Sequence, residues 1–217
     1  SLLLLKEALE RPNVDTWDWN FLLKTVSKFR LTSAIEIAIA ALTKEHFWDK
    51  NVVGFLAEQA KSTPELILEH FGNAALNNDN RLYFHFREYA PILESIPCEL
   101  SIAWIKDNGV QAAIALARHL PKPIVLNSKP HVPELTAFVL TEFENNDRVF
   151  REFCAGVGTS FVLEPVSEKI YLQKAEKAKL FLTSDIKRIR EWAEGEIKSN
   201  LRSAEFEKQS EEEDDIY

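Results

Sequence analysis

The sequence predicts an all-α fold, an α-α superhelix of about five helical hairpins. Apolar residues recur at helical spacing in paired segments, and the pattern restarts about every 35 residues. Each pair contains a short polar turn and is followed by a longer connection. One local motif also repeats: residues 150–154 (FREFC) recur in kind as residues 189–193 (IREWA). An apolar fraction of 46% with 6 glycines and 9 prolines is typical of a chain that buries a core.

The first pair is predicted from residue 16 to residue 42. Thr16 is a candidate N-cap of its first helix. Ser33 and Glu36 have the spacing of a capping box at the start of its second helix. Apolar residues on both sides of residues 34–42 predict that this second helix is buried over most of its circumference.

The second pair is marked most clearly at residues 63–65, where threonine, proline and glutamate form a helix start signal. Residues 77–97 interrupt the regular pattern, and we expect an irregular spacer with a short helix there.

Three further pairs are predicted to start near residues 97, 133 and 167. Gly109 suits the left-handed position at the end of the first helix from residue 97. The connections 121–132 and 156–166 are each about ten residues long, which exceeds the usual loop length. In a stack of hairpins both connections lie on one edge, and we expect recognition at that edge because binding residues concentrate on long loops.

The charge pattern divides the chain into an α-solenoid domain over residues 1–204 and an acidic disordered tail over residues 205–217. The tail holds seven acidic residues against Lys208, within a net charge of −8. Acidic side chains oppose the dipole at a helix C-terminus, so the last helix is expected to fray there. A solvated tail and an acidic interaction tail are the two interpretations.

Three features of the sequence concern the kind of protein to which the chain belongs and its location in the cell. It contains no methionine and begins with the apolar residues 2–5, which predicts a fragment of a larger protein; removal of an initiator methionine is the alternative. The longest mostly apolar stretch, residues 34–42, is far shorter than the roughly 20 residues of a membrane span. Cys98 and Cys154 lack metal or redox spacing, which favours a cytoplasmic protein.

No motif predicts an enzyme, a metal site or a cofactor. The histidines lack the spacing of metal ligands, and they are His46, His70, His85, His119 and His131. The segment 156–158 (GVG) lacks the third glycine and the lysine of phosphate-binding loops. The sequence therefore predicts a non-enzymatic protein.

The repeated motif, a polar turn followed by a β-branched or aromatic residue and an arginine, resembles the HEAT and armadillo type of α-solenoid. The C-terminal half, with segments such as SIAWIKDNGVQAAIALARHLP and AKLFLTSDIKRIREWAEGEI, resembles C-terminal solenoid regions of large bacterial multidomain proteins, including NACHT-like NTPases. The resemblance implies that an enzymatic or switching domain lies upstream. It also implies that this region senses a ligand or mediates assembly.

The resulting hypothesis is a protein–protein interaction or scaffold module whose partner is another protein or the upstream part of its own chain. The resemblance implies that the second helices line a concave side, with Arg118, Arg151 and Arg190 as candidate binding residues. Structural salt bridges between adjacent repeats are the alternative role of these arginines.

Nucleic-acid binding is the competing function, because residues 174–202 hold eight basic side chains against five acidic ones.

Overall fold

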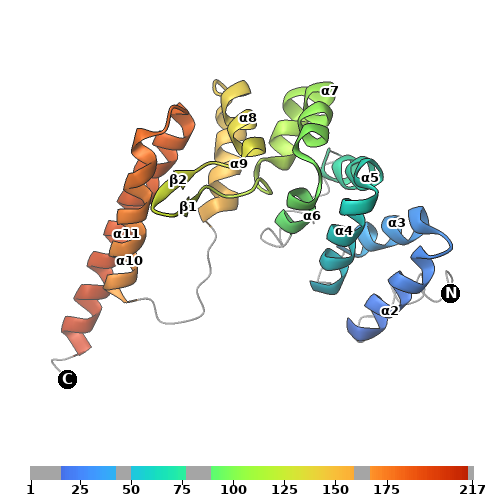
Figure 1. The fold of residues 1–217 in the computed structure, drawn as a ribbon. Helices are drawn as coiled ribbons and strands as arrows, with labels where there is room; N and C mark the ends of the chain where they lie inside the picture. The colour runs from blue at the N-terminus through green and yellow to red at the C-terminus, as the bar shows by residue number, and fades with distance from the viewer. Residues whose placement is uncertain (1–15, 43–49, 77–88, 159–166, 215–217) are drawn as a thin grey trace. The chain divides into compact units, whose positions relative to one another are not determined.

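The computed structural model describes residues 16–42, 50–76, 89–158 and 167–214 of the chain, and these residues form ten α-helices and one short β-hairpin (Figure 1). The predicted all-α fold class is therefore confirmed. Within the described residues, no helix has the length and apolar character needed to cross a membrane.

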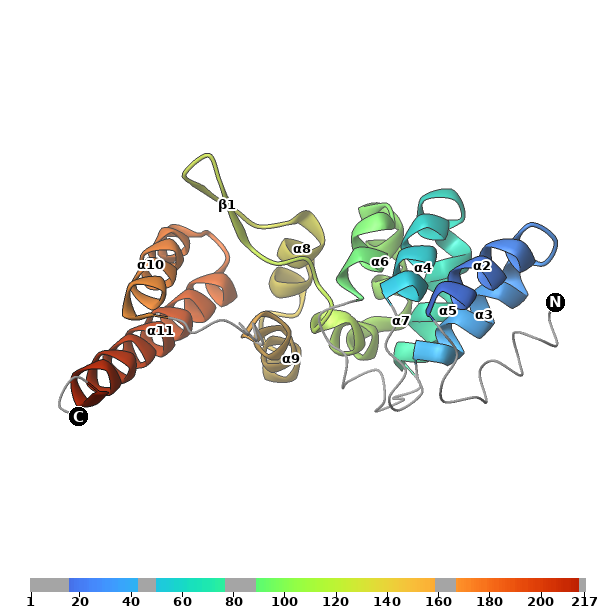
Figure 2. The same ribbon diagram turned by 90° about the horizontal axis from the view of Figure 1, so that it is seen from below.

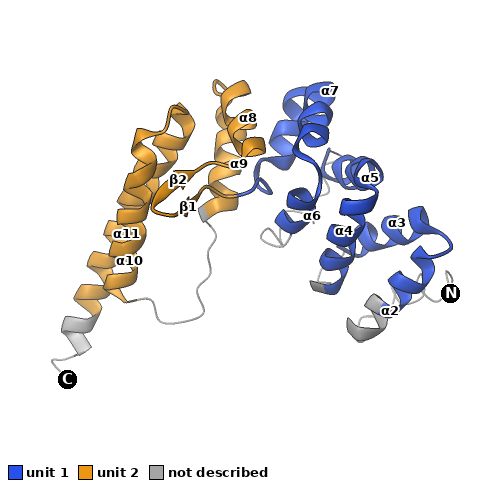
Figure 3. Cartoon of the chain, viewed as in Figure 1, with its two compact units in different colours: residues 1–121 blue, residues 122–217 orange. Residues whose placement is uncertain are grey.

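The chain divides into two compact units, residues 1–121 and residues 122–217 (Figure 3). This differs from the single domain over residues 1–204 that the sequence predicted. The division lies where Pro121 and Pro123 end the helical pattern, because proline removes a backbone donor and blocks continuation of a helix.

Unit 1 contains three successive helical pairs. They are α2 (Thr16–Ser27) with α3 (Leu31–Leu42), α4 (Lys50–Ser62) with α5 (Pro64–Leu76), and α6 (Ala90–Ser95) with α7 (Cys98–Ala117). In Figure 2, α2, α4 and α6 follow one another in one layer, and α3, α5 and α7 follow one another in the other. Each pair therefore packs on the next pair through both of its helices.

The third pair of unit 1 contains the break predicted at Gly109. Two helical segments meet there at a kink within α7, and the short helix α6 precedes them and packs on α4. Gly109 has a φ of 67°, a conformation that favours glycine.

Helix α3 is buried almost all round, as predicted. Its buried residues are Ala34, Ile35, Ile37, Ala38, Ile39, Ala41 and Leu42. The helix starts at Leu31, so Ser33 lies inside it, and the predicted N-cap position of Ser33 is wrong. The predicted start of α5 at Pro64 is confirmed.

An aromatic cluster fills the core of unit 1 beside the third pair. Tyr89, which precedes α6, contacts His119 with ring centroids 5.4 Å apart, and both rings contact Phe71 edge-on. The Tyr89 hydroxyl donates a hydrogen bond of 3.2 Å to the carbonyl oxygen of Leu42. Tyr89 therefore links the C-terminus of α3 to the third pair. The residues 77–88 of the predicted spacer lie outside the described residues.

Unit 2 contains two helical pairs and the β-hairpin. The pairs are α8 (Glu134–Glu142) with α9 (Asp147–Gly158), and α10 (Glu168–Lys179) with α11 (Lys187–Asp214). Their starts agree with the predicted positions near residues 133 and 167. A short 3₁₀ turn, η2 (Leu180–Thr183), ends α10, and α11 packs along α10 and also contacts α8 and α9.

The connection before α8 forms a β-hairpin that the sequence analysis did not predict. Strand β1 (Ile124–Leu126) pairs antiparallel with β2 (Lys129–His131), with Leu126 opposite Lys129. Asn127 and Ser128 form the two-residue turn and have φ values of 49° and 62°. Two positive φ angles are what a type I′ hairpin turn requires, and asparagine adopts them readily.

Helix α11 continues through the acidic residues to Asp214, whereas the sequence predicted a disordered tail from residue 205. Glutamate, glutamine, lysine and alanine are strong helix formers. The unfavourable dipole interaction is weaker, about 0.3–1 kcal/mol, and acts within the last turn. The helix propensity of these residues therefore outweighs the unfavourable interaction with the helix dipole over most of this segment. Residues 215–217 lie outside the described residues.

We predict that Gly72→Ala destabilises unit 1. A Cβ atom at buried Gly72 in α5 would lie 2.5 Å from Cζ2 and 2.8 Å from Cε2 of Trp104 in α7. The indole ring would have to move, so we expect a loss of roughly 1–3 kcal/mol in the free energy of unfolding, measured by urea denaturation.

Gly54→Ala in α4 is the matched control, because a Cβ atom there meets nothing within 4 Å. Alanine is the better helix former, so this variant should gain up to about 1 kcal/mol. An increase in stability for both variants would contradict the close approach of α5 and α7.

Candidate functional site

Unit 2 contains an open pocket of about 380 Å³ between the β-hairpin and the pair α10–α11. Its walls come from β1, α10, η2 and α11. The residues that line it are Pro123, Ile124, Val125, Lys174, Lys177, Ala178, Phe181, Trp192, Glu196 and Asn200. The hairpin therefore supplies one wall of a concave surface that helices alone would leave open.

The hairpin wall is apolar and accessible. Ile124 and Leu126 are 45% and 50% exposed, and they lie on the same side of β1 because side chains alternate along a strand. The flanking prolines and the β-branched residues Ile124 and Val125 favour this extended conformation over a helix. An exposed apolar strand beside a pocket is a surface on which another chain can bury its own apolar side chains.

The opposite wall of the pocket is built from packed aromatic rings. Trp192 contacts Phe181 and Phe153 edge-on, with ring centroids 5.4 Å and 6.3 Å apart. Phe181 and Phe153 are buried, so the indole ring of Trp192 is held firmly. Its Nε1 atom is buried and has no hydrogen-bond partner in the described structure. Most buried donors in proteins are paired, so this indole N–H is an unusual feature of the wall.

Charged side chains from two helices frame the pocket. Lys174 and Lys177 are three residues apart on α10 and therefore lie on one face of that helix. The Lys174 ammonium group lies 5.5 Å from the centre of the Tyr171 ring. Glu196 and Asn200 of α11 complete the polar set. The formal charge of the lining is +1, from two lysines and one glutamate.

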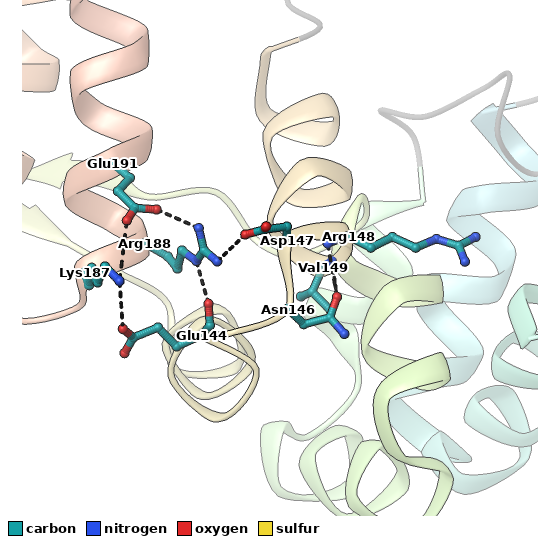
Figure 4. A network of polar contacts seen from close by, with 8 residues as sticks. All are labelled: Glu144, Asn146, Asp147, Arg148, Val149, Lys187, Arg188 and Glu191. Atoms are coloured by element: carbon teal, nitrogen blue, oxygen red, sulfur yellow. Dashed lines mark hydrogen bonds and ion pairs between the residues drawn. The ribbon is translucent and has the colours of Figure 1, made fainter.

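A second group of polar contacts joins the two helical pairs of unit 2 at Arg188 (Figure 4). The Arg188 guanidinium donates hydrogen bonds to the Glu144 carbonyl oxygen at 2.7 Å, to Asp147 at 2.7 Å and to Glu191 at 2.8 Å. It also lies 4.7 Å from the centre of the Phe150 ring. Its side chain is 12% exposed. Arg188 thus connects the turn between α8 and α9 to the start of α11.

The same contacts explain the charge state of Arg188. Partial burial opposes the charged form, but the hydrogen bonds to Asp147 and Glu191 outweigh it and raise the pKa of Arg188 above its ordinary value. Lys187 adds ion pairs to Glu144 at 3.5 Å and to Glu191 at 3.9 Å. The network is a structural connection between adjacent helical pairs. Structural salt bridges of this kind were the alternative role for Arg118, Arg151 and Arg190.

The three arginines predicted to bind a partner do not line the pocket. Arg118 is half-buried at the end of α7 in unit 1, and Arg151 is exposed on α9 in unit 2. Arg190 donates a hydrogen bond of 2.6 Å to the Ser184 carbonyl oxygen, so it holds the turn before α11.

The sequence analysis missed Lys174, Lys177 and Trp192 as members of one site. The two lysines were noted as part of the basic segment 174–202. Their shared face on α10 was readable from the spacing of three residues. The hairpin had a weaker signal, two β-branched residues before an Asn-Ser turn.

The cysteines are half-buried and form no disulfide with each other, and Cys154 is unsuited to nucleophilic chemistry. Burial raises the pKa of the Cys154 thiol to about 11, and the carboxylate of Glu196 acts in the same direction. The thiol is therefore protonated at neutral pH. Within the four described ranges, no three His, Cys, Asp or Glu side chains come close enough together to hold a metal ion. His46 and His85 lie outside these ranges.

Comparison with known proteins finds no matching family model, and it finds neither a curated protein nor a solved structure that is significantly similar to this chain.

We predict that Arg188→Ala and Arg188→Lys both destabilise the protein by roughly 1–3 kcal/mol, because hydrogen bonds to charged groups are worth about that much and lysine cannot reproduce the guanidinium geometry. The measurement is the free energy of unfolding in urea. Arg148→Ala is the control: Arg148 is exposed nearby on α9, and its loss should change stability by less than about 0.5 kcal/mol. Equal effects at both positions would contradict the structural role of Arg188.

We predict that alkylation of Cys154 by iodoacetamide in the native protein accelerates about 10-fold per pH unit from pH 8 to pH 10. The thiolate is the reactive species, and its fraction rises with pH until the pH passes the pKa of about 11. In urea the rate should level off above pH 9, near the ordinary pKa of 9.0. Peptide mass spectrometry measures both rates. A native rate that levels off at pH 9 would contradict the raised pKa.

Proposed function

We propose that this chain is a non-enzymatic protein-interaction module, an α-solenoid of the HEAT-like type that acts as a cytoplasmic scaffold or sensor in a larger bacterial protein. The observation that carries the proposal is the pocket of unit 2, which joins an exposed apolar strand to a wall of packed aromatic rings. A surface of this kind binds an extended segment of another protein, or of the upstream part of the same chain, by burying its apolar side chains.

The layered packing of unit 1 supports the solenoid part of the proposal. Its three pairs contact one another in order through both layers, which is how repeat proteins bury the apolar faces that a single pair leaves exposed. An array of this kind presents a fixed surface, and a connection between pairs is a suitable place for recognition. The hairpin of unit 2 is such a connection.

Nucleic-acid binding remains the second candidate, and the basic segment 174–202 is the observation that favours it. Four of its eight basic side chains form ion pairs or hydrogen bonds with groups of the same chain. They are Lys179 with Glu176, Lys187 with Glu144 and Glu191, Arg188 with Asp147 and Glu191, and Arg190 with the Ser184 carbonyl. Such contacts leave fewer cations for phosphate groups, so this function has the weaker support.

We predict that Ile124→Glu abolishes peptide binding without unfolding the protein. A random peptide library displayed on phage is selected against the full chain, and the affinity of enriched peptides is measured by fluorescence anisotropy. A carboxylate placed in the apolar wall should weaken binding at least 10-fold, because a charged group is costly to bury. The melting temperature should change little, since Ile124 is 45% exposed.

Leu201→Glu is the matched control for this experiment. Leu201 is also 45% exposed, lies on α11 and does not line the pocket, so this variant should retain binding. The proposal is wrong if no peptide is enriched, or if both variants lose binding equally. Binding of a duplex DNA that falls steeply with added salt, in the absence of peptide binding, would support the second candidate instead.

A further inference from the structure

The rim of the pocket carries a positive charge that the pocket interior does not neutralise. Among the residues of the described structure, neither Lys174 nor Lys177 has an ion-pair partner within 4.0 Å. The neighbouring lysines differ: Lys179 pairs with Glu176, and Lys187 pairs with Glu144 and Glu191. The two lysines of the pocket therefore remain available to a bound group, and they are the cations that line the pocket.

The single acidic residue of the lining does not cancel this charge. Glu196 lies on α11, and it forms no ion pair within 4.0 Å with either lysine of α10. Its carboxylate is close enough to the Cys154 thiol to help raise the pKa of that group. A negative group at the rim therefore meets two positive charges and one negative charge, and the net formal charge of +1 attracts it.

The buried apolar residues of the lining are Ala178, Phe181 and Trp192. The pocket is small, since a volume of about 380 Å³ is at the lower end of the range of about 300–1,000 Å³ for ligand pockets. It suits one or two apolar side chains rather than a folded domain.

We propose that the pocket binds an extended protein segment in which an acidic side chain directly adjoins a large apolar one. The apolar side chain enters between β1 and the Phe181–Trp192 wall, and the carboxylate lies at the rim formed by Lys174 and Lys177. This inference rests on the proposed protein-binding function and names the chemistry of the partner. The two lysines determine specificity. A serine in place of the acidic residue would lose the attraction, and a lysine in its place would be repelled.

The test uses four fluorescein-labelled octapeptides, blocked at both ends, and the full chain. The first contains the core Asp-Asp-Leu-Phe between glycine and serine residues. In the second, lysines replace the two aspartates; in the third, serines replace leucine and phenylalanine; in the fourth, serines replace all four core residues. We expect the first peptide to bind at least 10-fold more tightly than each of the others.

Charge reversal in the protein supplies the decisive comparison. The affinity of K174E/K177E for the acidic peptide should fall at least 10-fold, and its affinity for the lysine peptide should rise. The control K169E/K198E has the same change in net charge, at exposed lysines of α10 and α11 that do not line the pocket, and it should bind like the unchanged protein. Circular dichroism and melting temperature confirm that both variants fold.

Three failures are distinguishable. If peptides with the apolar pair bind equally whatever their charge, and K174E/K177E has no effect, the acidic specificity is overturned while protein binding stands. If none of the four peptides binds and phage selection also enriches nothing, both the inference and the proposed function are overturned. If a single-stranded DNA 20-mer binds instead and K174E/K177E abolishes that binding, the rim recognises phosphate groups and the proposal is overturned.

Discussion

The structure depends on one constraint, that a helical pair of this length leaves an apolar face which a neighbouring pair must cover. Helix α3 shows it most clearly, because it is buried on nearly all sides and could not be stable in water alone. In unit 1 the constraint is met by repetition: each pair contacts the next through both layers. Where repetition is this regular, a close approach such as that of Gly72 to Trp104 becomes necessary, since larger residues would separate the layers.

Unit 2 meets the same constraint with more polar interactions. Its two pairs bury Phe153, Ile189 and Trp192 against one another, but the turn between α8 and α9 is connected to α11 through Arg188. One guanidinium donates to a backbone carbonyl and two carboxylates and also lies over the Phe150 ring, so a single side chain fixes the orientation of two helical pairs. This matters for the pocket because α11 supplies one of its walls, and a wall that shifted would lose the shape of the site.

Sequence periodicity was sufficient to predict the helices because their stability comes from apolar faces that the spacing reveals. The paired helices from residues 133 and 167 and the burial of α3 follow from it. The hairpin at Ile124–His131 could not be predicted with the same security, since strands of three residues show no periodicity and the turn lacks glycine. The kink at Gly109 shows another limit of sequence reasoning. The glycine indicates that the backbone changes direction there, but the spacing does not reveal that α6 packs on α4 beside this helix.

The candidate site was harder to predict than the fold because it combines segments far apart in the chain. Ile124, Lys174 and Trp192 lie on a strand and two helices, and no spacing in the sequence relates them. The sequence-based choice of Arg118, Arg151 and Arg190 relied on a repeated motif, yet repeated residues in stacked pairs commonly serve the packing that all pairs share, as the contact of Arg190 with Ser184 illustrates. Features that distinguish one pair from the others are better guides to recognition. In unit 2 the hairpin and the lysines Lys174 and Lys177 are such features, and they meet at the same pocket.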